Sequence, residues 1–273
     1  MEHGFKHNIH GNLHYLSVPS FDSTGLVTTC FTTRLGGVSA PPLDSMNLGF
    51  GRGDERNNVI LNYEAAGRGA GFPARRVVAF TQVHKNDVCI ATCADAGEAF
   101  RHDKREFDAV ITAEAGLPIA TYHADCVPVF LLDTRLKVCG VAHAGWRGTA
   151  LKCPSRAVSV MQEAFGSRPR DILAAIGPAI GKCCFETDKD VPDAVFSAFG
   201  ESAFPYISQH GARYHVDLPG LNARALLESG IPDENITMSD ECTCCQSELY
   251  WSHRKTGGVR GAMMALIMLR RDA

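Results

Sequence analysis

The order of apolar and polar positions along the chain predicts a mixture of strands and helices. Seven short apolar runs are rich in β-branched and aromatic residues, as strands are; they span 26–33, 77–83, 107–112, 127–132, 137–142, 172–176 and 262–269. Four other segments have helical patterns, at 57–70, 148–165, 191–199 and 218–229. Some strands follow one another directly while others are separated by helices. The pattern therefore predicts an α+β fold rather than a doubly wound one.

The first fifteen residues lack such a pattern. They are polar, hold four histidines and contain no apolar stretch like that of a secretory signal. We therefore expect residues 1–15 to be a flexible polar tail, in which His3, His7 and His10 bind metal only adventitiously. Because no Pro- or Gly-rich linker divides the rest, we expect residues 16–273 to form one domain.

Composition narrows the class of function. The 273 residues are 45% hydrophobic and 21% charged, as in ordinary globular proteins. The net charge of −3 gives no basic surface for nucleic acid, and no apolar stretch is long enough for a membrane helix. Eleven cysteines in a chain of this length favour reduced thiols over a disulfide framework. We expect a cytoplasmic enzyme with a small-molecule substrate and no obligate protein partner.

The centre of the chain predicts a β-hairpin that carries a thiol and an imidazole. Two apolar strands flank a short polar turn. If the loop comprises residues 133–136, Leu132 faces Lys137 and Cys126 lies opposite His143, on the same face of the sheet. A three-residue loop would place the two side chains on opposite faces.

A third candidate ligand, His84, follows the apolar run 77–83. One Cys and two His would bind Zn²⁺ and leave a fourth position for water, and the same ligands also accept copper. Alternatively, Cys126 and His143 form a nucleophilic dyad, or they are ordinary buried residues. Asp125 could orient the histidine or act as an acid or base, and it could equally be a solvent-exposed carboxylate.

Two further segments contain chemically useful groups. Arg34 and the glycines after it offer a cation and free amides that can hold an anion, within an irregular loop over 34–54. The run 241–254 concentrates thiols, an imidazole and a guanidinium. Cys242 and Cys245 form a C-x-x-C without a second pair at zinc-ribbon spacing. This favours core or site-lining thiols over a second metal site.

Together these motifs resemble the laccase-domain family, also called multicopper polyphenol oxidase-like proteins and, in bacteria, the peptidoglycan editing factor group. The matching stretches are TRLGGVS at 33–39, NLG at 47–49, QVH at 82–84, DA at 108–109, ADCVP at 124–128, AHAGWRG at 142–148, GPAI at 177–180 and LYWSHR at 249–254. The resemblance implies a single catalytic domain with a mixed β-sandwich-like core flanked by helices. It also implies a zinc site formed by His84, Cys126 and His143. The chain departs from the family after Arg254, where the spacing to the next arginine, Arg260, differs.

The resemblance further implies phosphorolysis of adenosine, inosine, guanosine and methylthioadenosine, together with deamination of adenosine. On this hypothesis Zn²⁺ or Cu²⁺ is the cofactor and phosphate the co-substrate. The predicted catalytic residues are Asp125 and Arg34, and the predicted substrate-binding residues are Asn47, Gln82, Arg147 and Arg254.

Three other hypotheses remain open. A copper polyphenol oxidase would need more histidines than the sequence supplies around Cys126. A Cys–His hydrolase would act on peptide or peptidoglycan precursors without metal. A non-catalytic metal-binding protein would close the site with a fourth ligand, from His123 or from a thiol of Cys242 or Cys245.

Overall fold

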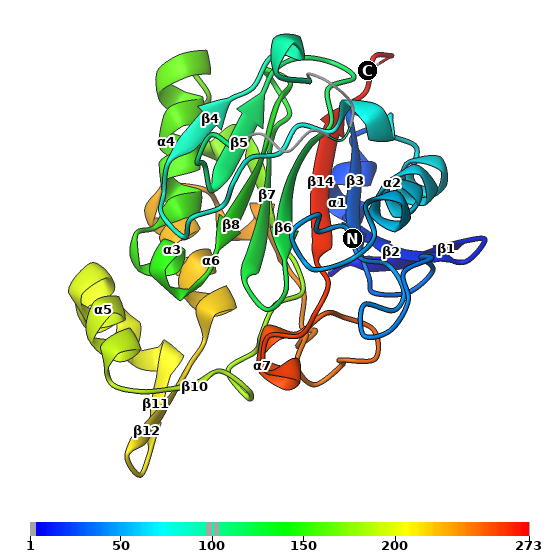
Figure 1. Cartoon of the computed structure of the whole chain (residues 1–273). Helices are drawn as coiled ribbons and strands as arrows, with labels where there is room; N and C mark the ends of the chain where they lie inside the picture. The colour runs from blue at the N-terminus through cyan, green and yellow to red at the C-terminus, as the bar shows by residue number, and fades with distance from the viewer. Residues whose placement is uncertain (1–3, 97–99, 101–103, 273) are drawn as a thin grey trace.

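Two β-sheets packed face to face form the body of the molecule (Figure 1). The computed structural model describes residues 4–96, 100 and 104–272. The five-stranded sheet has the order β1 (Lys6–His10), β2 (Leu13–Ser17), β3 (Val27–Thr32), β14 (Met263–Leu269) and β6 (Ile119–His123). The six-stranded sheet has the order β13 (Ile236–Met238), β9 (Ile172–Ile176), β7 (Val127–Asp133), β8 (Val138–Ala144), β5 (Ala109–Thr112) and β4 (Val88–Ile90).

Helices cover the outer faces of both sheets. The α-helices are α1 (Pro19–Asp22), α2 (Arg56–Ala70), α3 (Trp146–Ala150), α4 (Cys153–Phe165), α5 (Asp190–Phe199), α6 (Leu218–Glu228) and α7 (His253–Thr256). Short 3-10 helices span Ala74–Arg76, Cys93–Ala96, Pro169–Asp171, Gly200–Tyr206 and Asp233–Asn235. A small sheet of β10 (Glu186–Thr187), β12 (Arg213–Val216) and β11 (Ile207–His210) extends from the body beside α5 (Figure 1). None of the helices described could cross a membrane, given their length and hydropathy.

The alternation of side chains along each central strand explains the layers. In β7, Val129 and Leu131 pack in the cluster that α4 and α6 share with the six-stranded sheet. Their neighbours Phe130 and Leu132 face the other way, into the core between the two sheets. In β14, Ile267 packs between the sheets while the residues beside it in sequence pack in the cluster that includes α2. A strand that is buried on both faces is a continuous apolar run in the sequence. The central strands β7 and β14 could therefore be predicted.

The fold agrees with the predicted α+β class and sandwich-like core, and six of the seven predicted strands overlap observed ones. The run 77–83 forms only isolated bridges, Val78 with Ile119 and Thr81 with Glu106. The predicted helix 148–165 is divided into α3 and α4, because Lys152 adopts a left-handed conformation (φ 52°) and Pro154 begins the second helix.

The predicted register of the central hairpin was wrong by two residues. Pro128, rather than Cys126, pairs with His143, and the four-residue loop spans 134–137 instead of 133–136. Asp133 explains the difference, because its Oδ1 accepts hydrogen bonds from the backbone N–H groups of Arg135 and Leu136 and fixes the turn one residue later. A shift of two residues keeps every side chain on the same face. Cys126 and His143 therefore still lie on the same face of the sheet.

The segment expected to be a polar tail forms strands β1 and β2, which pair antiparallel from Lys6 with Ser17 to His10 with Leu13. Strand β2 in turn pairs with β3 through Tyr15 and Leu16. Leu13 and Leu16 of β2 are buried, but two buried leucines are too few for an apolar pattern that would reveal this strand in the sequence. His7 and His10 thus lie on an edge strand, and His3 lies outside the described residues.

The layered core gives a prediction about stability. Phe130 is fully buried between the sheets. We expect Phe130→Ala to lower the free energy of unfolding by about 3–5 kcal/mol, because it removes apolar contacts and leaves a cavity. Leu61→Ala, on the exposed side of α2, is the control and should change it by less than about 0.5 kcal/mol. Urea titration monitored by fluorescence measures both; a loss below about 1 kcal/mol for Phe130→Ala would contradict the packing described.

Candidate functional site

The three predicted metal ligands converge where the central strands end. Cys126 lies in the short turn between β6 and β7, His143 lies near the end of β8, and His84 lies in a loop beside them. Their ligand atoms, one sulfur and two ring nitrogens, all lie within 4.8 Å of one another. The Cys126 Sγ is 3.9 Å from the His84 Nε2, and the two imidazole rings are 4.9 Å apart. The arrangement could hold one metal ion.

A buried carboxylate, Asp108, orients both histidines. Its oxygens accept hydrogen bonds from the backbone N–H groups of Val83 (3.2 Å), His84 (3.0 Å) and Lys85 (2.8 Å). The Oδ1 also lies 2.9 Å from the Nδ1 of His143, which fixes that ring with its Nε2 toward the site. Burial alone would raise the pKa of Asp108, but the hydrogen bonds from His143 and the backbone hold it below its usual value. The sequence contained Asp108 in a matching motif without indicating this positioning role.

The backbone around the site is tightly constrained. His84 and Asp125 have positive φ angles of 59° and 83°, a conformation that non-glycine residues rarely adopt. Asp108 holds the backbone at His84, and such strain often occurs at functional sites. Gly145 leaves space for the ligands, since a Cβ atom there would lie 2.8 Å from His84 Cδ2 and 3.0 Å from Cys126 Sγ.

The thiol and the imidazole of His143 stabilise each other's charged forms. Burial alone would raise the pKa of Cys126, but His143 and His84 lower it to about 6. Burial alone would lower the pKa of His143, but the Cys126 thiolate and Asp108 raise it to about 9. A thiolate is the form that binds metal and attacks electrophiles, so the site supports either role for Cys126.

The proposed fourth ligand His123 is otherwise engaged. Its Nε2 lies 2.8 Å from the hydroxyl of Thr121 and its Nδ1 lies 3.0 Å from the carbonyl of Cys126. Within the described part of the chain, the group of ligand atoms contains only His84, Cys126 and His143. Three ligands leave a coordination position open, as in catalytic zinc sites.

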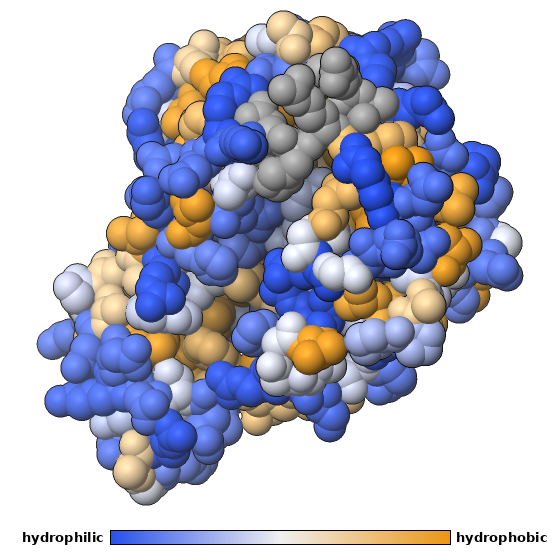
Figure 2. Space-filling model, viewed as in Figure 1, coloured by the Kyte–Doolittle hydropathy of each residue, from blue (hydrophilic) through white to orange (hydrophobic). Residues whose placement is uncertain are grey.

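Two cavities meet at His84 and Cys126. One, of about 330 Å³, is lined by His84, Cys126 and His143 together with Arg52 and Gln82. The other, of about 350 Å³, is lined by Asp125 and by residues of α3 and α7. Both include His84, Cys126 and Arg260. Figure 2 shows that hydrophilic residues predominate on this face and that the surface is hollowed near its middle, where β6 and β8 end and β7 begins.

Arg260 is the functional candidate to which the sequence gave no role. Burial, and then the charge of Arg52, lower the pKa of its guanidinium to about 10. Its buried Nε has no hydrogen-bond partner among the described residues, where a buried donor is normally satisfied. Two cations on one cavity wall with an unsatisfied donor suit an anionic ligand. The Val-Arg260-Gly sequence offered no signal beyond a basic residue with unusual spacing.

The other predicted site residues divide into two groups. Gln82, Arg147, Arg254 and Asp125 line the two cavities. Arg34 and Asn47 are not in the lining of either cavity. The Arg34 guanidinium donates to the carbonyls of Asp44 and Ser247 and stacks on Trp251. Asn47 is fully buried, where it connects its loop to Ala262. Both residues stabilise the loop 34–54, whereas the sequence suggested that they contact the substrate.

Asp125 lies between two donors. Its Oδ1 accepts a 2.7 Å hydrogen bond from the hydroxyl of Thr243, and its Oδ2 accepts one of 2.7 Å from the backbone N–H of Arg254. Arg254 also donates from Nη1 to the carbonyl of Cys184. These contacts connect the residue before Cys126 to two loops distant in sequence.

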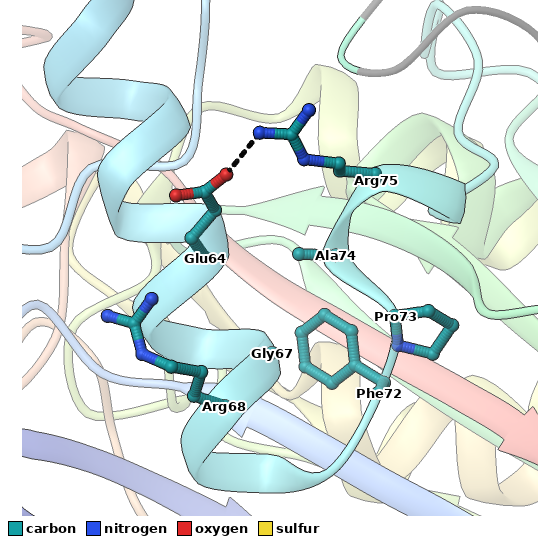
Figure 3. A pocket seen from close by; sticks show the side chains of 7 residues that line it. All are labelled: Glu64, Gly67, Arg68, Phe72, Pro73, Ala74 and Arg75. Carbon is teal, nitrogen blue, oxygen red and sulfur yellow. Dashed lines mark hydrogen bonds and ion pairs between the residues drawn. The ribbon is translucent and has the colours of Figure 1, made fainter.

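A further pocket lies beside α2 and contains no comparable chemistry. Its volume is about 340 Å³, and an ion pair between Arg75 and Glu64 crosses one side of it (Figure 3). The remaining lining includes Gly67, Phe72 and Ala74, with neither cysteine nor histidine. The convergence of His84, Cys126 and His143 is therefore the candidate functional site.

Comparison with known proteins gives consistent results. Residues 28–270 match the family described as multi-copper polyphenol oxidoreductase laccase. The purine nucleoside phosphorylase YlmD of Geobacillus stearothermophilus is 37% identical over 245 residues, which cover 88% of this chain and 89% of that protein. The purine nucleoside phosphorylase YfiH of Escherichia coli is 34% identical over 254 residues, 92% of this chain and 99% of that protein.

Solved structures agree with the fold. The crystal structure of YlmD from Geobacillus stearothermophilus superposes with a TM-score of 0.92 at 34% identity, covering 99% of this chain and 100% of that one. That of the Bacillus licheniformis hypothetical protein YfiH gives 0.89 at 34% identity, covering 94% and 96%. The α+β sandwich is therefore shared with these proteins.

The role of Asp108 is tested by Asp108→Asn. An amide cannot accept all four hydrogen bonds, so we expect metal affinity to fall about 10–100-fold. The control is Asp133→Asn, which alters another buried aspartate that accepts two backbone N–H groups, far from the ligands. Competition with a chromogenic chelator measures both affinities. Equal affinities in the two variants would contradict a positioning role for Asp108.

The charge state of Cys126 can be measured in metal-free protein. Because thiolate reacts and thiol does not, alkylation of Cys126 by iodoacetamide should rise with pH around a midpoint near pH 6. Cys93 is an internal control, since its hydrogen bond to Glu114 raises its pKa above the usual value. Peptide mass spectrometry distinguishes the two sites. A midpoint above pH 8 for Cys126 would contradict the thiolate–imidazolium pair.

Proposed function

The chain belongs to the multi-copper polyphenol oxidoreductase laccase family, and we propose that it is a metal-dependent purine nucleoside phosphorylase that also deaminates adenosine. The names of its relatives from Geobacillus and Escherichia support the phosphorylase activity. The proposed substrates are adenosine, inosine, guanosine and methylthioadenosine, with phosphate as co-substrate. All eleven cysteines are free thiols, which supports the cytoplasm as its location.

One observation carries the proposal: an open three-ligand group shares a cavity wall with two cationic side chains, Arg52 and Arg260. The ligand group suits one metal ion, and the arginines suit an anion beside it. The cavity of about 330 Å³ falls within the range typical of small-molecule sites.

The donor set fits zinc, which we propose as the metal. One thiolate and two imidazoles are usual zinc ligands, although they also accept copper. When bound with three protein ligands, Zn²⁺ supplies Lewis acidity and lowers the pKa of a coordinated water. When a metal takes the place of the Nε2 proton, His143 would coordinate as a neutral imidazole, with its Nδ1 proton engaged by the Asp108 carboxylate.

Phosphorolysis requires a phosphate oxygen to attack the sugar C1′ while the bond from C1′ to the purine nitrogen breaks. We propose that Arg260 and Arg52 hold the phosphate, in the role that the sequence suggested for Arg34. Arg34 already donates to Asp44 and Ser247, whereas Arg260 retains an unsatisfied donor beside the ligands. Arg147 and Arg254 line the adjoining cavity and could contact the rest of the substrate.

The leaving purine takes the electron pair of the broken bond and requires a proton. In deamination, water adds to the purine C6 and ammonia leaves, which also requires proton transfer. We propose Asp125 for both transfers, since it lines the cavity that contains Cys126 and is held there by Thr243 and the Arg254 backbone. Gln82 would shape the wall of the other cavity, beside His84 and His143, because both polar atoms of its amide are fixed by the backbone of Tyr122.

The activity is tested with zinc-loaded protein, adenosine, and buffers with and without phosphate. We expect phosphate-dependent release of adenine and phosphate-independent formation of inosine, both lost in Cys126→Ala. Arg260→Gln should raise the KM for phosphate about 10–100-fold, because charge-assisted hydrogen bonds are lost, and should change deamination little. Arg34→Gln is the matched control and should leave that KM unchanged. Chromatography separates the products.

Other outcomes would identify a different function. If adenosine, inosine and methylthioadenosine all remain intact, the phosphorylase proposal fails. Oxygen consumption with a phenol and copper-loaded protein would indicate a polyphenol oxidase. Metal-independent hydrolysis of peptidoglycan precursors, abolished by alkylation of Cys126, would indicate a Cys–His hydrolase.

A further inference from the structure

Four cysteines from two distant loops gather into a second group of thiols, outside the cavities described above. Cys183 and Cys184 lie in the loop between β9 and β10, and Cys242 and Cys245 lie in the loop between β13 and α7. We propose that these four thiols, called here the four-cysteine cluster, bind a Zn²⁺ ion in a closed structural site. The sequence did not predict this, because Cys183 and Cys184 are adjacent rather than at zinc-ribbon spacing.

The distances between the sulfurs support a single tetrahedral ion. Cys183 Sγ is 3.8 Å from Cys184 Sγ and 3.6 Å from Cys245 Sγ. The sulfurs of Cys184 and Cys245 are 3.4 Å apart. All four sulfurs lie within 4.8 Å of one another. With Zn–S bonds of about 2.3 Å, the edges of a ZnS₄ tetrahedron are about 3.8 Å long. A disulfide would require a separation of about 2.05 Å, well below those observed.

The two loops are held together without the ion, so the cluster is preorganised. Ala179 and Cys242 form an isolated parallel bridge, and the segments before β10 and α7 lie side by side in Figure 1. The backbone N–H of Gly181 donates to the Cys242 Sγ at 3.2 Å. An N–H donor aimed at sulfur stabilises the thiolate that a metal requires. At Gly181 a Cβ atom would approach Cys183 Sγ to 3.2 Å and Cys242 Cβ to 3.3 Å, which accounts for glycine at that position.

The donor set selects the metal and the role. Four thiolates are soft ligands, and zinc sites with four protein ligands are structural rather than catalytic. An iron–sulfur cluster would place several metal and sulfide ions between the thiolates, and sulfurs all within 4.8 Å leave room for one ion. The four-cysteine cluster therefore differs in kind from the open group at Cys126.

The cluster also supports the site described above. The carbonyl of Cys184 accepts a hydrogen bond from Arg254, and the hydroxyl of Thr243, the residue after Cys242, donates to Asp125. Arg254 in turn donates its backbone N–H to Asp125. An ion that joins the two loops would thus fix the position of Asp125, the residue before Cys126.

The test counts metal ions by plasma mass spectrometry in protein purified and desalted without chelator. We expect about two zinc ions per chain in the wild type and about one in Cys184→Ser/Cys245→Ser. Cys126→Ala should also retain about one, and combining the three changes should leave none. Cys244→Ser is the matched control, because it removes a neighbouring thiol outside the cluster and should retain both ions.

A second measurement leaves all four cysteines of the cluster in place. In Cys126→Ala loaded with Co²⁺, a site with four thiolates gives an intense sulfur-to-cobalt charge-transfer absorption. The proposal would be overturned if the wild type holds one zinc ion that persists in the double variant. It would also be overturned if that absorption is absent, or if the bound metal is iron. So would loss of two titratable thiols in anaerobically denatured protein, which would indicate a disulfide. None of these readouts depends on nucleoside turnover, so the proposed function can fail independently.

Discussion

The buried carboxylate of Asp108 is the group on which the candidate site most depends. It lies directly before β5, and through four hydrogen bonds it holds the loop 83–85 and the ring of His143 together. An ionised carboxylate without exposure is costly to bury, and its donors must compensate that cost. Two of the three candidate ligands are therefore positioned by a residue that is not itself one of the ligands. The site is thus as rigid as the sheet that carries Asp108.

Sequence patterns were informative where strands are buried on both faces and where helices are amphipathic. The segments 172–176 and 191–199 were found nearly to the residue because local apolar periodicity determines them. The strands β1 and β2 were missed because their pairing, not their composition, makes them strands. The hairpin register shifted because Asp133 forms a turn through its side chain, a contact that periodicity does not record.

In the candidate site, too, some residues could be predicted from local sequence patterns and others only from the fold. His84, Cys126 and His143 could be predicted, because each follows or ends an apolar run and strand ends converge. Arg34 and Arg260 could not be distinguished, because both are arginines near glycines and only the fold decides which one has unsatisfied donors beside the ligands. Cys183 and Cys245 could not be paired either, since their proximity depends on where two loops distant in sequence meet.

Strand β14 carries a consequence for how the molecule is made. It is the last strand of the described chain, yet it lies in the interior of its sheet, hydrogen-bonded to β3 on one side and β6 on the other (Figure 1). During synthesis on the ribosome, β3 and β6 therefore emerge long before the strand that separates them. Each presents an unpaired edge until residue 269 has left the exit tunnel, and exposed edges invite association with other chains. Closure of this sheet therefore waits for β14, whatever the order in which the other elements fold.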